Sequence, residues 1–82
     1  MDENLTPLSF ARQGDTVEVA RVRGNEDLHR RLENLGFVSG AAVRIIADQG
    51  GNLIIAVKGT RVAVNRATAA RILTRPSSGV RA

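Results

Sequence analysis

The sequence contains no cysteine, and this absence excludes several classes of protein. The 82-residue chain cannot form disulfides or bind a metal through thiolates, so it is not a disulfide-stabilised secreted scaffold. Tryptophan and tyrosine are absent as well, and the two phenylalanines are Phe10 and Phe37. Proteins that stack the bases of single-stranded nucleic acid usually carry more aromatic side chains than this.

Long apolar stretches are also missing. No run approaches the roughly 20 residues that span a bilayer, and the acidic opening Met1-Asp2-Glu3-Asn4 is unlike the basic start of a signal peptide. We therefore expect a cytoplasmic protein that does not itself cross a membrane. The composition, 43% hydrophobic and 24% charged, is that of one small globular domain.

The charge that is present is mostly arginine. The formal net charge is +4, and the single lysine is Lys58. Arginine pairs bidentately with carboxylates and phosphates, so an acidic protein, a nucleic acid or an anionic membrane face are all suitable partners. The charge alone does not choose among them.

Four stretches predict β-strands, with glycine-containing turns between them. They are residues 16–23, 41–48, 53–58 and 61–64. In the first, Val17 and Val19 share one face of the strand and Val22 falls on the other, which predicts a bulge before Val22. The third is almost continuously apolar, so we expect both of its faces to be covered.

Residues 25–35 predict the clearest helix in the chain. Asn25 is a suitable N-cap, and the pairs Glu26–Arg30 and Asp27–Arg31 have the spacing and order of helical ion pairs. An apolar stripe at i, i+4 and i+7 is expected to hold the helix to the domain. The stripe consists of Leu28, Leu32 and Leu35.

The end of this helix can also be predicted from the sequence. Gly36 stands where a left-handed residue terminates a helix, and Phe37 follows at the position that packs back onto Leu32 in a Schellman motif.

Two shorter helices are expected, one near each end. Thr6-Pro7 has the pattern of a cap followed by a first helical residue, and Asn65 is a suitable cap for a helix over residues 66–73. Together the elements predict a mainly β fold, a small barrel of four or five strands with an inserted helix and a short C-terminal helix. We expect this domain to span residues 6–75, with flexible segments at 1–5 and 76–82.

Catalytic and metal-binding patterns are missing. The serines lie in turns, caps and the tail, and the carboxylates are scattered, so we identify no catalytic residues. We expect no cofactor and no dedicated metal site. The single histidine, His29, has Glu26 and Glu33 at helical spacing, which leaves a weak surface metal site open as a hypothesis.

Three segments, taken in order, resemble the FeoA family. Residues 24–40 are similar to its signature, in which a glycine precedes Arg-Arg-Leu, then Leu-Gly, then a further glycine. Leu8-Ser9 with Gly14-Asp15 looks like the family's opening, and residues 53–66 resemble its closing strands. The resemblance covers residues 8–73. Ser39 departs from it where proline is common, and Asn65 departs where a basic residue is frequent.

The resemblance implies an SH3-like β-barrel and an accessory role in ferrous iron uptake. The implied partner is FeoB, a membrane permease, on its cytosolic side, and nucleic acid is then not expected. The residues themselves leave open a nucleic-acid-binding barrel, a weak transition-metal-sensing domain and a homo-oligomer.

We therefore assign two sets of residues. The expected partner-binding set comprises His29, Arg30, Arg31, Phe37 and Arg61. The residues expected to fix the local fold are Asn25, Leu28, Leu32, Leu35, Gly36, Gly40 and Gly59.

Overall fold

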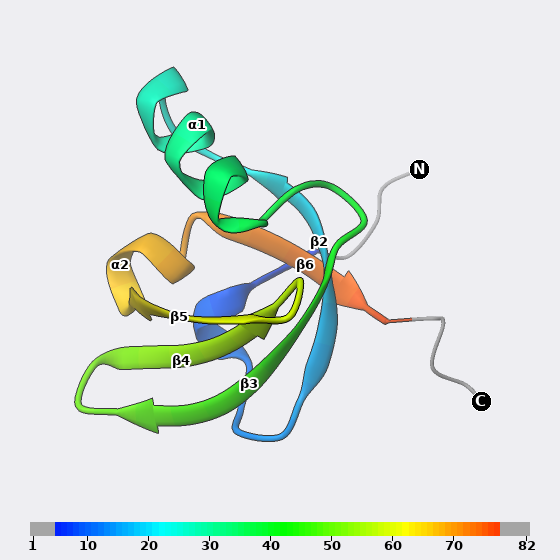
Figure 1. The fold of residues 1–82 in the computed structure, drawn as a ribbon, viewed down its shortest axis with the longest axis vertical. Coiled ribbons are helices and arrows are strands. Elements are labelled where there is room, and N and C mark those ends of the chain that lie inside the picture. Colours follow the sequence, from blue (N-terminus) through cyan, green and yellow to red (C-terminus); the bar gives the residue numbers. More distant parts are fainter. Residues whose placement is uncertain (1–4, 78–82) are drawn as a thin grey trace.

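The computed structural model describes residues 5–77 as one antiparallel sheet that curls around a core (Figure 1). The elements are β1 (Thr6–Pro7), the 3₁₀ helix η1 (Leu8–Phe10), β2 (Thr16–Val22), α1 (Glu26–Leu35), β3 (Ala42–Gln49), β4 (Asn52–Val57), β5 (Thr60–Asn65), α2 (Arg66–Ala69) and β6 (Ile72–Pro76). The mainly β prediction is confirmed, with six strands where four or five were expected. Residues 1–4 and 78–82, most of the two segments expected to be flexible, lie outside the described residues.

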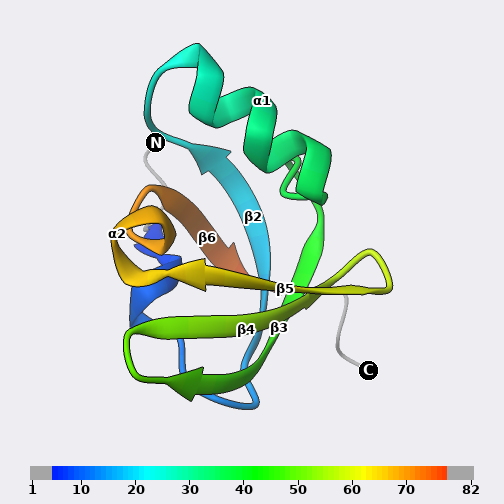
Figure 2. The ribbon, with the colours of Figure 1, turned by 60° about the vertical axis from the view of Figure 1, so that its left-hand side comes forward.

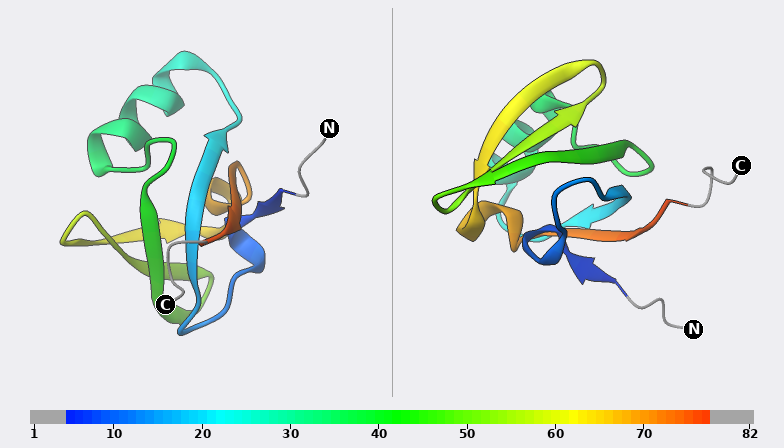
Figure 3. Two further views of the ribbon diagram at one scale, coloured as in Figure 1. Left: turned by 90° about the vertical axis from the view of Figure 1, so that its right-hand side faces the viewer. Right: turned by 90° about the horizontal axis from the view of Figure 1, so that it is seen from below.

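The strand order across the sheet is β1-β6-β2-β3-β4-β5, so β1 and β5 are its edge strands. Figure 3 shows the strong curl that brings the two halves of the sheet around one core. The largest fully buried side chains are Phe37, Leu8, Ile45, Leu53, Ile55, Ile72, Val19, Val43 and Val57. They come from many different elements, as expected for a domain with a single small core.

The bulge predicted before Val22 is confirmed. The register between β2 and β6 shifts between Val19 and Arg21, which returns the strand's apolar residues toward the core. A second shift lies in β3 between Ile45 and Ala47, and the sequence analysis did not predict it. Both bulges add to the local twist that a small curled sheet needs.

One face of β4 is buried and the other is only partly covered. Leu53, Ile55 and Val57 are buried, whereas Ile54 and Ala56 are half-buried. The expectation of two covered faces was therefore wrong for the outer face, because the sheet curls around its inner side and leaves the outer side in contact with solvent.

The expected helix over residues 66–73 was too long. Asn65 does cap α2, since its Oδ1 accepts a hydrogen bond from the Thr68 amide at 2.8 Å. The helix nevertheless ends at Ala69, and Ile72 begins β6, which inserts between β1 and β2. Pairing with two strands satisfies far more backbone groups than another helical turn would, and Pro76, expected in the tail, belongs to this strand.

The N-terminal segment also differs from its prediction. Thr6 lies in β1 opposite Thr74, and Pro7 is the N-cap of η1, without a side-chain capping bond. Thr6 is therefore a strand residue and not a helix cap, because the edge of β6 offers its backbone a partner. The Oγ1 of Thr74 donates to the Thr6 carbonyl at 2.7 Å.

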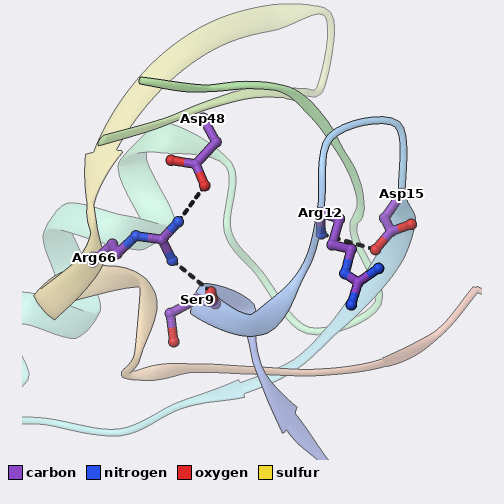
Figure 4. Close-up of polar contacts among 5 residues, drawn as sticks. All are labelled: Ser9, Arg12, Asp15, Asp48 and Arg66. Atoms are coloured by element: carbon purple, nitrogen blue, oxygen red, sulfur yellow. Dashed lines mark hydrogen bonds and ion pairs between the residues drawn. The ribbon is translucent and has the colours of Figure 1, made fainter. Parts of the chain in front are cut away.

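A single arginine connects three segments that are distant in sequence (Figure 4). Arg66, the first residue of α2, donates from Nη1 to the Ser9 carbonyl at 2.8 Å and pairs through Nη2 with Asp48. It thereby ties α2 to η1 and to the end of β3. Nearby, the Arg12 amide donates to Asp15 Oδ2 at 2.9 Å and closes the turn that leads into β2.

Candidate docking surface

The helix α1 begins at a side-chain cap. The Oδ1 of Asn25 accepts a hydrogen bond from the Leu28 amide at 2.9 Å, and Glu26 and Asp27 place negative charge at the first turn. Figure 2 shows α1 lying above β5 at one side of the barrel. This arrangement leaves much of the helix surface facing outward.

The helix ends in a Schellman motif that fixes it against the barrel. The Gly36 amide donates to the Glu33 carbonyl and the Phe37 amide to the Leu32 carbonyl, each at 2.9 Å. Gly36 has a φ of 107°. A Cβ there would lie 3.3 Å from a methyl group of Val57, so this end of α1 lies against the β4–β5 turn.

Phe37 does not belong to a binding surface. Its side chain is 1% exposed and is part of the hydrophobic core, so its inclusion in the partner-binding set was wrong. The Schellman motif explains this, because it turns the residue after Gly36 inward under the helix.

The three leucines of the predicted stripe have different environments. Leu32 is 3% exposed and lies in the core, Leu28 is half-buried against it, and Leu35 is 43% exposed. Leu35 therefore does not anchor the helix as predicted. It lines a groove of about 190 Å³ between α1 and β5, together with Ala63.

The predicted cations are exposed, and the structure separates them between two flanks of the helix. Arg31 lines the groove beside β5, the strand that also carries Arg61. Arg30 and the half-buried His29 lie along the other flank, in a hollow that Glu33 also lines. These residues were expected to form one partner-binding set, whereas in the structure only Arg31 and Arg61 border the same strand.

The ion pairs expected along α1 do not form. Among residues 5–77, the salt bridges join Arg66 to Asp48 and Arg75 to Glu18, and Arg30 and Arg31 pair with no carboxylate of this part of the chain. Their guanidinium groups are consequently available to a partner.

Most of the residues that line the groove between α1 and β5 were not predicted from the sequence. Leu35 was assigned to the core and Ala63 received no role, yet both line the groove. Their exposure depends on β5 being an edge strand, which follows only from the strand order. Phe10, 72% exposed, lies in a separate hollow of about 560 Å³ between η1 and the ends of β2 and β6.

Within the described part of the chain, no three histidine, cysteine or acidic side chains come together in a way that could hold a metal ion, and this includes His29 with Glu26 and Glu33. None of the helices described in residues 5–77 is long and apolar enough to cross a membrane.

The six antiparallel strands curl into a small barrel with one long helix above an edge strand, and its similarity to a solved prokaryotic SH3 domain protein makes it an SH3-like barrel. The FeoA domain family matches residues 6–76. A putative Fe(2+) transport protein A from Methanocaldococcus jannaschii is 33% identical over 69 residues, which is 84% of each chain.

Solved structures agree with this assignment. The zinc complex of FeoA from Stenotrophomonas maltophilia, a prokaryotic SH3 domain protein, is 30% identical with a TM-score of 0.75, covering 89% of this chain and 91% of that one. A crystal structure of the iron uptake regulatory protein FeoA is 29% identical with a TM-score of 0.80, covering 89% and 97%. The chain belongs to the FeoA family, and it is a non-enzymatic accessory protein of ferrous iron transport.

Proposed function

We propose that this protein docks on the cytosolic side of a FeoB-type permease and modulates it. The observation that carries the proposal is a set of exposed arginines on α1 and β5 that pair with no carboxylate of residues 5–77, namely Arg30, Arg31 and Arg61. Family membership supplies the transport system in which such a surface would act.

Exposed arginines suit a docking role for a physical reason. Complementary charges steer two proteins into register and raise the association rate, and they contribute more to rate and specificity than to raw affinity. The planar guanidinium also binds a carboxylate through two parallel hydrogen bonds. An acidic patch on the permease would therefore recognise Arg31 and Arg61, which border the same strand, in one orientation, and Arg30 would contribute from the other flank of α1.

The proposal is tested by retention of detergent-solubilised FeoB on the immobilised protein. The wild type should retain the permease at moderate salt, and the double variant Arg30→Glu/Arg31→Glu should retain at least tenfold less. Arg44→Glu/Arg71→Glu is a charge-matched control, because both arginines are exposed, one on β3 and one between α2 and β6, and neither lines the hollows beside α1, and it should behave like the wild type. If the wild type retains no FeoB, the proposal fails.

The same assay addresses a nucleic-acid-binding barrel. Phe37 is buried, so Phe10 is the one exposed aromatic side chain in the described residues, and it offers little surface for base stacking. Salt-sensitive retention of an RNA oligomer in place of the permease would favour this alternative, since phosphate contacts release counterions.

A further inference from the structure

The edge strand β5 has backbone groups that no other strand pairs. Lys58 and Gly59 have φ values of 54° and 78° and join β4 to β5 as a two-residue hairpin loop. The loop makes Val57 and Thr60 the first hydrogen-bonded pair. In an antiparallel ladder the direction of the backbone groups then alternates, so the N–H and C=O groups of Arg61 and Ala63 point away from β4.

These outward groups remain without a partner in the described chain. The sheet ends at β5, and none of the turn, loop or cap hydrogen bonds of residues 5–77 involves the backbone of Arg61 or Ala63. Both residues are exposed. Two donors and two acceptors thus lie in a row along one edge, which is the arrangement that an added strand pairs with.

A groove lies beside the Ala63–Asn65 end of this edge, with α1 and Thr68 of α2 as its other walls. Its volume is about 190 Å³, below the roughly 300–1,000 Å³ of small-molecule pockets. Leu35 and Ala63 contribute apolar surface, Arg31 contributes a cation, and no acidic side chain lines the groove. A side chain of an extended segment that pairs with the edge of β5 would enter this groove and lie against α1.

We infer that this groove binds an extended acidic segment of a partner protein as an additional strand beside β5. The charges select this occupant. Arg31 and Arg61 have no carboxylate partner among the described residues. A second copy of the chain, with a net charge of +4, would bring arginines against arginines. The inference rests on the proposed function and deepens it, because it names the surface that would receive the permease.

The test uses a substitution that removes one outward donor. Ala63→Pro deletes the amide that points into the groove and leaves the ladder to β4 intact, since proline is accepted at the solvent side of an edge strand. Ala63→Ser keeps the amide and is the matched control. A thermal melt of both variants establishes that each is folded. Ala63→Pro should bind solubilised FeoB at least tenfold more weakly than the wild type, and Ala63→Ser should bind within twofold of it.

Amide exchange followed by NMR supplies a readout that needs no variant. The Arg61 and Ala63 amides should exchange rapidly in the free protein and become protected when FeoB is bound. If FeoB binds while both amides stay unprotected and Ala63→Pro binds normally, the groove is not the docking site, although the proposed function survives.

A second probe separates the failure of the groove from the failure of the proposed function. If the wild type does not bind FeoB, an acetylated heptapeptide of alternating valine and glutamate decides the inference. Selective shifts of the Arg61 and Ala63 amides with this peptide, and none with its valine–lysine counterpart, support the groove, and their absence overturns it. A wild-type dimer in sedimentation that Ala63→Pro dissociates would also overturn it, in favour of a second copy.

Discussion

Gly36 determines how α1 meets the barrel. Its φ of 107° is a conformation that costs a residue with a side chain about 1–2 kcal/mol. An added Cβ would also lie 3.1 Å from the Cγ of Lys58 and 3.3 Å from Val57. The backbone conformation and the close packing against Lys58 and Val57 therefore both favour glycine at this position.

We predict that Gly36→Ala lowers the free energy of unfolding by about 1–2 kcal/mol or more, measured by urea denaturation. Gly40→Ala is the control, because Gly40 has a φ of 90° and open space where the added methyl group would lie. The control should lose less stability than Gly36→Ala, since it adds backbone strain without the contact. Equal losses would show that the contact with Val57 and Lys58 has no energetic effect.

At the scale of the element, α1 is held at its two ends more than along its length. Leu32 is its one buried residue, and the cap at Asn25 and the Schellman motif at Gly36 satisfy backbone groups that the helix leaves unpaired. A change at either end should therefore loosen the whole helix.

We expect Asn25→Ala to destabilise the protein by about 0.5–2 kcal/mol, because the Leu28 amide loses its acceptor. Asn25→Asp retains an acceptor and should stay close to the wild type. Hydrogen exchange across Glu26–Leu35 would locate the effect in α1. Faster exchange confined to the sheet would contradict it.

The elements also show what a sequence can and cannot predict. The cap at Asn25, the stop at Gly36 and the bulge before Val22 depend on neighbouring residues, and the structure has all three. The strand at Ile72–Pro76 depends on the free edges of β1 and β2, which no local pattern reveals. The assignment of Leu35 to the core failed for the same reason, because its burial depends on where the barrel lies. The burial of Phe37, in contrast, follows from the Schellman motif that the sequence predicts.

The residues of the candidate surface likewise fall into two groups, those that the sequence predicts and those that it does not. The exposure of Arg30 and Arg31 follows from the polar side of a helical pattern. The free backbone of Arg61 and Ala63 follows from the position of β5 at the end of the sheet. The sequence therefore predicts the exposed arginines of α1, but it does not predict the free backbone edge of β5 beside them.

For the whole molecule, the net charge of +4 should govern the rate of encounter more than the lifetime of a complex. We predict that raising the salt concentration from about 50 to about 300 mM slows association with FeoB several-fold, because exposed charges are screened over about 10 Å at 0.1 M. Dissociation should change little. Stopped-flow or biolayer measurements at several salt concentrations would check this, and a rate of association independent of salt would contradict it.

The pairing of Thr6 with Thr74 has a consequence for the order in which the sheet can form. These residues lie 68 positions apart, and β6 stands between β1 and β2. The β2–β3–β4–β5 ladder joins strands that are neighbours in sequence and can form first, whereas β1 has no partner in the sheet until β6 is in place. Such distant pairing favours folding in milliseconds to seconds over microseconds, and the β1–β6 pairing should be among the last to form.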